Sequence, residues 1–300
     1  MAFAPPRKVL ITGALGNLGR KLIDHLLTLP WCESIVGVDI AGDAAPFAKH
    51  DRRVQIVFGD PRDWNDRRWK DALSGVEGIA HFAAQRPYED ADWIDVSVSI
   101  DITANLLEAS AAAGVRRFVF ATSNHVMGGY KDAPLANTIG RGTLTTALMP
   151  APGTKVRVGD RASDSTPYAT TKLMGERLCR AKALATNGKL TTVATRIGWC
   201  QPGANEPRTM NLSGTPSADA PPPANADEAR DLKWFRSMWL SNRDFLNLFE
   251  RALVADPAGW PEPGITVNGM SANKDMPWDI ETTKRLIGYQ PKDDVWSHVK

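Results

Sequence analysis

A glycine-rich turn near the start of the chain constrains its fold more than any other feature of the sequence. The turn reads Thr12-Gly13-Ala14-Leu15-Gly16-Asn17-Leu18-Gly19; it follows the apolar run Val9-Leu10-Ile11 directly and leads into a helical pattern. A glycine turn between a strand and a helix lets the pyrophosphate of a dinucleotide approach the backbone and meet the N-terminus of the helix. The sequence therefore predicts that the chain begins with a dinucleotide-binding βαβ unit.

Short β-rich runs alternate with helical patterns along most of the chain. The predicted strands are residues 9–12, 34–38, 54–58, 78–82, 117–121 and 190–196, and the predicted helices are residues 17–29, 64–73, 92–113, 168–185 and 232–253. Such alternation implies a parallel sheet with helices on both faces. We therefore expect an α/β fold, a Rossmann-type doubly wound parallel sheet, with its ligand at the carboxyl ends of the strands.

Two irregular segments interrupt this pattern. Glycine, proline and threonine dominate residues 128–161, and residues 201–231 contain a proline-rich stretch at 218–226. We expect one unit over residues 1–300, with a dinucleotide-binding core at about 7–200, a small substrate-binding part at about 201–300, and insertions near 130–162 and 209–231. The second insertion is poor in apolar residues, which is typical either of a mobile lid or of a disordered segment.

Composition and charge argue against several classes of protein. The 300 residues are 43% apolar and 23% charged, and the formal net charge is +2. These values are ordinary for a globular protein and predict neither a nucleic acid nor a membrane as partner. The three cysteines lack the spacing of a metal site or a disulfide framework, and no apolar run approaches the length of a membrane span. We expect a cytoplasmic protein without a bound metal.

A second motif, Tyr168-Ala169-Thr170-Thr171-Lys172, opens a long helical pattern. Thr166 and Pro167 predict the start of this helix, with the threonine as N-cap and the proline at the first helical position. Tyr168 and Lys172 then project from one helical face. Free tyrosine titrates near pH ~10, and an ammonium, a positively charged nicotinamide and the helix N-terminus all favour its anion. We expect Tyr168 to remove a hydroxyl proton while hydride leaves the same carbon.

The strand at 117–121 ends in polar residues that are candidates for the same site. Thr122, Ser123 and Asn124 follow this strand directly, at the edge of the sheet where ligands bind. We expect the Ser123 hydroxyl to hydrogen-bond the substrate oxygen; the alternative is that Thr122 or Ser123 only terminates the strand. We interpret His125 as a candidate for the substrate pocket rather than as the general base.

Acidic residues at the ends of the second and third strands bear on the choice of cofactor. Asp39 ends the strand at 34–38, and its carboxylate can accept hydrogen bonds from both ribose hydroxyls and repel a 2′-phosphate. Ile40-Ala41-Gly42 follows, without an arginine or lysine to receive that phosphate. The sequence therefore favours NAD over NADP. Asp60 is a candidate contact for the adenine amino group, or alternatively a helix cap or turn residue before Pro61.

These motifs resemble those of the extended short-chain dehydrogenase/reductase superfamily, the superfamily of NAD-dependent epimerases and dehydratases. The runs Thr122-Ser123-Asn124-His125, Arg196-Ile197-Gly198 and Gly269-Met270-Ser271-Ala272-Asn273 look most like the uronate dehydrogenases. That branch oxidises the anomeric carbon of hexuronic acids to an aldarolactone with NAD. The resemblance implies catalytic roles for Ser123, Tyr168 and Lys172. It also implies cofactor contacts from Gly13, Gly16, Asn17, Leu18, Gly19, Asp39, Ile40, Asp60, Pro61, Phe82, Ala83, Ala84, Tyr168, Lys172 and Ile197.

The substrate-binding residues depart in part from that branch. Arg208 stands where the branch carries an arginine that grips the sugar carboxylate, a role suited to paired, charge-assisted hydrogen bonds. Trp199 replaces a serine that contacts the substrate, and Arg86 stands at another polar contact. The implied substrate-binding set is Arg86, Ser123, Asn124, His125, Trp199 and Arg208. We expect an anionic carbohydrate that differs in shape from a simple hexuronate.

Three functions fit the sequence. The first is an NAD-dependent dehydrogenase that oxidises a hydroxyl group of a sugar acid or related anionic carbohydrate. The second is a sugar-nucleotide epimerase or dehydratase that retains NAD and returns the hydride. The third is a non-catalytic sensor that binds a dinucleotide. The sequence leaves open whether the protein forms a homodimer.

Overall fold

The computed structural model describes residues 3–50, 52–85 and 92–299. Its main sheet has seven parallel strands in the order β3-β2-β1-β4-β5-β8-β9. The strands are β1 (Lys8–Thr12), β2 (Ser34–Asp39), β3 (Val54–Phe58), β4 (Gly78–His81), β5 (Arg117–Ser123), β8 (Thr191–Ile197) and β9 (Gly264–Gly269). The predicted Rossmann-type doubly wound sheet is confirmed, and β9 is an edge strand that the sequence pattern did not reveal.

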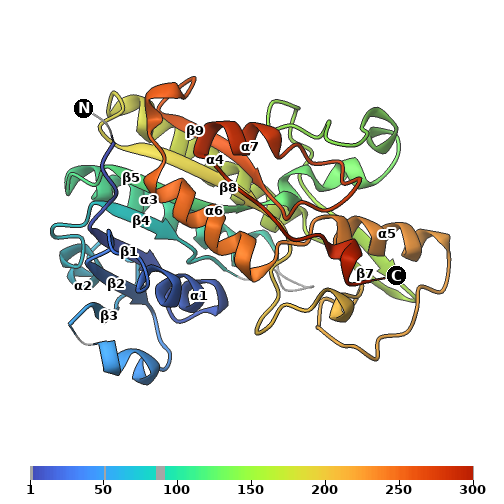
Figure 1. Cartoon of the computed structure of the whole chain (residues 1–300), viewed down its shortest axis with the longest axis horizontal. Coiled ribbons are helices and arrows are strands. Elements are labelled where there is room, and N and C mark those ends of the chain that lie inside the picture. The colour runs from blue at the N-terminus through green and yellow to red at the C-terminus, as the bar shows by residue number, and fades with distance from the viewer. Residues whose placement is uncertain (1–2, 51, 86–91, 300) are drawn as a thin grey trace.

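Helices cover both faces of this sheet (Figure 1). One face carries α1 (Asn17–Leu26), α6 (Asn242–Val254) and α7 (Glu281–Ile287), and the other carries α2 (Arg67–Asp71), α3 (Trp93–Ala112) and α4 (Thr166–Ala185). No helix in the described ranges has the length and apolarity needed to cross a membrane.

Burial on both faces explains why the central strands read as nearly continuous apolar runs. Along β5, Val119 and Ala121 pack into the core beneath α1 and α6, whereas Phe118 and Phe120 pack into the core beneath α3 and α4. All seven residues of β5 are buried. The strand therefore holds its polar end, Thr122 and Ser123, firmly at the carboxyl edge of the sheet.

Helices and a hairpin beyond that edge form a second, smaller part of the molecule, which includes segments both before and within the predicted substrate-binding part at 201–300. They are the short helices at Asn124–Lys131, Leu135–Thr138 and Pro207–Thr209, the antiparallel pair β6 (Lys155–Val158) and β7 (Arg161–Asp164), and α5 (Ala226–Ser237). Their apolar side chains share a separate core that includes Val126, Leu144, Trp234 and Trp278. The two predicted insertions contribute to this part, because the first contains the hairpin and the second ends in α5.

The prediction of one helix at residues 232–253 is wrong, because α5 and α6 are separated by a break at Met238–Ser241. The break has two local causes. Trp199 and Leu240 are joined by a backbone hydrogen bond of 3.0 Å, which pairs the break with the segment after β8. The Ser241 side chain then caps α6 by accepting from the backbone N–H of Asp244 at 3.0 Å. A serine N-cap is a recognisable helix start, but aromatic residues on both sides hide it in the sequence.

Candidate active site

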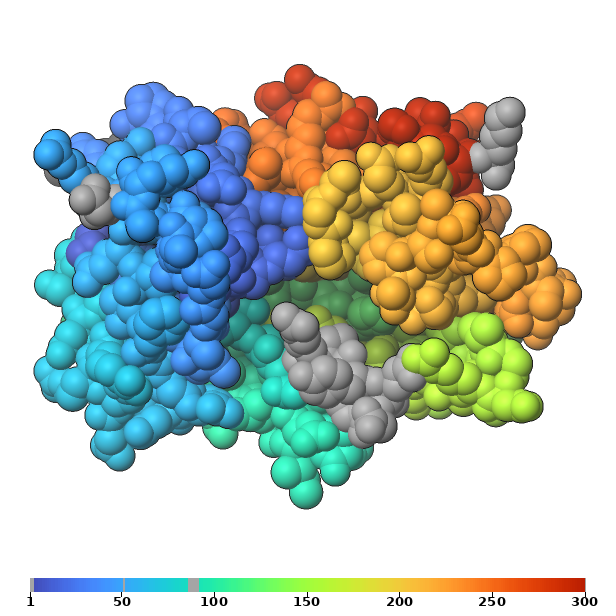
Figure 2. Space-filling view, turned by 90° about the horizontal axis from the view of Figure 1, so that it is seen from below, coloured from blue at the N-terminus to red at the C-terminus, as the bar shows by residue number. Residues whose placement is uncertain are grey.

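A cavity of about 580 Å³ lies at the carboxyl ends of β5 and β8. Figure 2 shows the molecule hollowed on this side, between the N-terminal half and the segment at about 200–220. We call it the central cavity, and it is lined among others by Leu18, Ser123, Asn124, His125, Arg161, Asp164, Tyr168, Ile197 and Trp199. The structure thus brings together most of the residues that the sequence assigned to catalysis and substrate binding.

Tyr168 and Lys172 lie on one face of α4, as their spacing predicts. The Lys172 Nζ atom is 5.7 Å from the centroid of the Tyr168 ring and 5.0 Å from that of Phe120. Lys172 is 4% exposed and donates to the carbonyl oxygen of Ala121 at 2.9 Å. The predicted helix start is one residue out: the N-cap is Ser165, and Thr166 is the first helical residue. Thr166 does not cap the helix because its hydroxyl donates to Asp164.

Burial governs the protonation of this pair. It raises the pKa of Tyr168 to about 12, although a hydrogen bond with Ser123 acts in the opposite direction. Burial also lowers the pKa of Lys172 to about 8. The groups of this chain therefore do not by themselves produce the lowered tyrosine pKa that the sequence analysis expects. The sequence analysis also expects the positive charge of the nicotinamide to lower the pKa of Tyr168, and this charge is present only when the cofactor is bound.

Ser123 and His125 are joined to the segment that precedes α4. The Ser123 hydroxyl oxygen accepts from the backbone N–H of His125 at 3.2 Å. The His125 Nδ1 atom is 2.8 Å from the Thr154 hydroxyl and 3.0 Å from the Ser165 hydroxyl. Burial lowers the pKa of His125 to about 4, so its ring is neutral at neutral pH. The ring meets Tyr168 edge-on, with centroids 6.0 Å apart. This network positions His125 beside Tyr168, and the lowered pKa makes its imidazole a weak base.

The glycine turn has the shape that a dinucleotide requires. Gly13 has a φ of +64°, and a Cβ atom there would lie 3.0 Å from the backbone nitrogen of Ala83. At Gly19 a Cβ atom would lie 2.3 Å from the carbonyl oxygen of Gly13. Gly16 is the N-cap of α1, so the free N–H groups of that helix begin at Asn17. These residues therefore fit a pyrophosphate at the helix N-terminus.

Asp39 is held at the end of β2 by its neighbours. One carboxylate oxygen accepts from the N–H of Leu15 at 2.9 Å and the other from the N–H of Ile40 at 2.8 Å. Each oxygen keeps a lone pair for a ribose hydroxyl. Arg20 of α1 donates to the carbonyl oxygens of Leu15 and Asp43, both at 2.7 Å. A cation from α1 thus lies beside the turn that follows Asp39, which a search of the residues after Asp39 could not reveal.

The other predicted cofactor residues line the edge of the sheet beside this turn. Asp60 forms a two-pronged ion pair with Arg62 and also accepts from its backbone N–H at 3.0 Å, so it does serve as a turn residue. The buried Pro61 accepts from Asn105 at 2.9 Å. Phe82 packs on Phe249 with ring centroids 4.8 Å apart. Ala83 and Ala84 follow it, half-buried, and Ile40 is 61% exposed.

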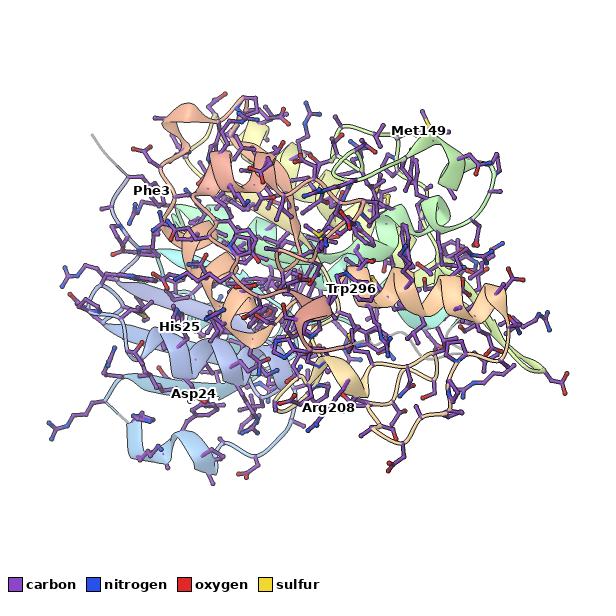
Figure 3. All side chains as sticks on the ribbon, turned by 45° about the vertical axis from the view of Figure 1, so that its right-hand side comes forward. Phe3, Asp24, His25, Met149, Arg208 and Trp296 are labelled. Carbon is purple, nitrogen blue, oxygen red and sulfur yellow. The ribbon has the colours of Figure 1, made fainter. Side chains whose placement is uncertain are left out.

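The predicted substrate residues divide into three groups. Asn124, His125 and Trp199 line the central cavity; the amide of Asn124 donates to the Ile197 carbonyl at 3.1 Å. Arg208 does not line it: this exposed residue lies on the turn at Pro207–Thr209, beneath Trp296 in Figure 3. Arg86 falls outside the described residues. The hairpin adds cavity residues that no sequence motif marks, and two of them, Arg161 and Asp164, are charged. Within the described ranges no cluster of histidine, cysteine or acidic residues is arranged to hold a metal ion.

Comparison with known proteins identifies a family and several relatives. Residues 9–198 match the model of a family described as "NAD dependent epimerase/dehydratase family". The chain is 29% identical to L-arabinose 1-dehydrogenase (NAD(P)(+)) of Haloferax volcanii, over 96% of this chain and 97% of that protein. It is 30% identical to a uronate dehydrogenase of Pseudomonas syringae pv. tomato, over 96% of this chain and 83% of that protein. A solved structure of a mutated uronate dehydrogenase is similar, with a TM-score of 0.65 and 26% identity over 97% of this chain and 84% of that one.

Proposed function

Because the chain belongs to the NAD-dependent epimerase/dehydratase family, we propose that it oxidises a hydroxyl group of an anionic carbohydrate, with Tyr168 as the general base. It is an NAD-dependent sugar dehydrogenase of the short-chain dehydrogenase type. The finer proposal is that the substrate is a sugar acid or a related anionic sugar and that the anomeric hydroxyl reacts. One observation carries it: Ser123 and Tyr168 meet in a cavity that also holds Arg161.

The residues divide the chemistry between them. NAD, when bound, accepts the hydride; Gly13, Gly19 and Asp39 would hold its pyrophosphate and ribose. The ionised oxygen of Tyr168 takes the proton of the substrate hydroxyl, and the carbon that bore this hydroxyl becomes a carbonyl carbon. General acid–base assistance of this kind is worth about 10²- to 10⁴-fold.

Two neighbours prepare the reacting oxygen. Ser123 donates a hydrogen bond to the substrate oxygen and so orients it toward Tyr168. Lys172, held against Ala121 at 2.9 Å, places an ammonium below the phenol and favours its anion. We propose that the lysine also reaches the nicotinamide ribose when NAD is bound.

The walls of the central cavity support an anionic substrate that differs in shape from a simple hexuronate. Trp199 presents a large aromatic surface and packs edge-on against Phe235, with ring centroids 5.4 Å apart. Arg161 supplies a guanidinium, which forms paired, charge-assisted hydrogen bonds with carboxylates and phosphates. Because Arg208 lies outside the cavity and Arg161 lines it, we propose that Arg161 contacts the anionic group of the substrate.

A substrate screen tests the proposal. Purified protein with NAD is incubated with uronates, aldoses, sugar phosphates and hydroxy acids, and the release of NADH is followed by its absorbance. We expect NADH to accumulate with an anionic sugar. Conversion of a sugar nucleotide into its epimer without net NADH would instead identify an enzyme that retains its cofactor. NAD binding without turnover of any compound would favour a dinucleotide-binding sensor.

A further inference from the structure

A second cavity, of about 770 Å³, lies on the other side of α5 from the central cavity. Helix α5 and the segment before it line both cavities, but no residue is common to the two linings. Phe235 of α5 faces the central cavity, whereas Leu232, Lys233 and Arg236 face the second one. The C-terminal segment closes the second cavity with Lys274, Asp275 and Trp296. This space is therefore separate from the site of oxidation.

The second cavity carries an excess of positive charge. Four cationic side chains line it, against the single carboxylate of Asp275, which lies 3.4 Å from Arg141. The four are Arg208, Lys233, Arg236 and Lys274. Among the described residues none of these four has an acidic partner within ion-pair distance. An anion in the cavity would therefore meet several uncompensated cations.

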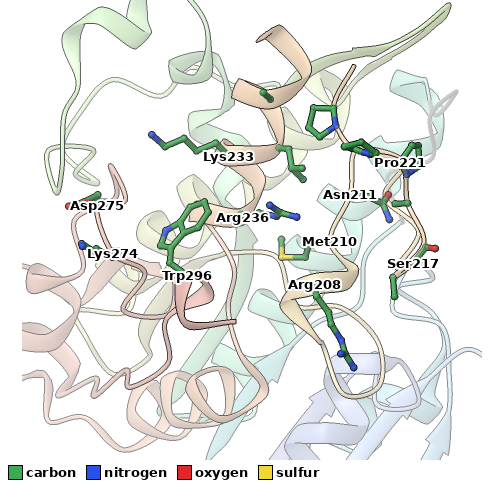
Figure 4. Close-up of a pocket in the computed structure, with 16 residues that line it drawn as sticks. Arg208, Met210, Asn211, Ser217, Pro221, Lys233, Arg236, Lys274, Asp275 and Trp296 are labelled. Carbon is green, nitrogen blue, oxygen red and sulfur yellow. The ribbon is translucent and has the colours of Figure 1, made fainter. Parts of the chain in front are cut away.

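Arg236 is the member of this set that most needs a partner. Its Nε atom is buried and has no hydrogen-bond acceptor within the part of the chain that the structure describes. Burial without a counter-ion also lowers the pKa of Arg236. A buried donor without an acceptor costs free energy, and the cost is larger for a charged group. Figure 4 shows the guanidinium directed toward the segment that carries Met210 and Asn211, whereas Arg208 points away at the rim.

The rest of the lining suits the organic part of a small molecule. Met210, Leu232 and Trp296 provide apolar surface, and the three prolines at 221–223 form a stiff wall. A cavity of this size, lined by both apolar and polar groups, is large enough for a small molecule.

We propose that the second cavity binds a phosphorylated small molecule, whose phosphate contacts Arg236. A guanidinium suits a phosphate because it provides paired, charge-assisted hydrogen bonds, and the ammonium groups elsewhere in the lining add positive potential. The site is distinct from both the dinucleotide turn and the central cavity, so the proposal does not depend on the identity of the oxidised sugar.

Calorimetry with inorganic pyrophosphate tests this site. The full chain is first saturated with NAD so that the dinucleotide turn is occupied, and pyrophosphate is then titrated. We expect binding that Arg236→Gln weakens about tenfold or more, the effect of losing a charge-assisted hydrogen bond. Lys233→Gln, at an exposed position, should weaken it in the same direction. Arg177→Gln is the matched control, because Arg177 is exposed on α4 and lines neither cavity.

Two outcomes would overturn the proposal. One is the absence of pyrophosphate binding to the NAD-saturated protein. The other is binding whose affinity is unchanged in Arg236→Gln and Lys233→Gln, because the anion then binds at another site. Equal weakening in Arg177→Gln would also overturn it, because the affinity then depends on net charge alone. Circular dichroism shows whether each variant is folded. If Arg236→Gln does not fold, the comparison of Lys233→Gln with Arg177→Gln still tests the proposal.

Discussion

The ammonium of Lys172 donates to the carbonyl oxygen of Ala121 across 2.9 Å, and this bond fixes α4 to the end of β5 beside Ser123. The lysine therefore helps to hold Tyr168 and Ser123 in position relative to each other. The same lysine is close enough to the Tyr168 ring to act on its oxygen electrostatically.

Replacement of Lys172 should thus damage two properties at once. We expect Lys172→Ala to reduce kcat and also to weaken NAD binding, because the lysine supports the phenolate and, in our proposal, the nicotinamide ribose. Turnover is measured by NADH release and NAD affinity by calorimetry. Lys182→Ala, on the same helix but outside the central cavity, is the control. Normal NAD affinity in Lys172→Ala would remove the ribose contact from the account.

Asp39 should determine the preference for NAD. Its carboxylate is fixed by two backbone N–H groups and repels a 2′-phosphate, so we expect much higher kcat/KM with NAD than with NADP. Asp39→Ala should narrow this difference, and Arg20 of α1, beside the turn, provides the cation that a 2′-phosphate would meet. The double variant Asp39→Ala, Arg20→Ala separates the loss of repulsion at Asp39 from the attraction between Arg20 and the 2′-phosphate. Equal efficiency with both cofactors in the parent protein would contradict the assignment.

The stability of the protein should fall on the acid side of neutrality. His81 is fully buried between the hydroxyls of Thr12 and Thr103, and burial lowers its pKa from 6.5 to about 3. The unfolded chain therefore binds a proton at this histidine below about pH 6.5, whereas the folded chain does not. The resulting loss of stability is about 2 kcal/mol by pH 5. Urea titrations at several pH values measure the free energy of unfolding. Its dependence on pH below about 6.5 should be weaker in His81→Gln than in the parent protein.

Arg161 and Arg208 can be distinguished by their effect on KM. Arg161 lines the central cavity and Arg208 does not. We therefore expect Arg161→Gln to raise KM for the best anionic substrate about tenfold or more, the cost of a charge-assisted hydrogen bond. Arg208→Gln should leave KM nearly unchanged. The opposite result would return the carboxylate-binding role to Arg208, where the sequence resemblance placed it.

Local patterns account for the parts of the structure that could be predicted. The turn at Gly13–Gly19 and the apolar run of β5 are contiguous in sequence, so their geometry follows from a few residues. Tyr168 and Lys172 are one helical turn apart, which fixes their common face. What the sequence did not reveal depends on contacts between distant segments: β9 pairs with β8 across about 70 positions, and Arg161 reaches the cavity only because the hairpin folds over it. Arg20 likewise meets the Asp39 turn from another element.

The most direct test of the account compares the parent protein with Tyr168→Phe. The substitution keeps the aromatic ring and removes the ionisable oxygen, while the glycine turn and Asp39 stay intact. With the best substrate of the screen, under conditions in which the chemical step limits the rate, we predict a fall in kcat of about 10²- to 10⁴-fold with unchanged NAD affinity. Near-parental kcat in this variant would contradict the account, because another residue would then have to remove the proton.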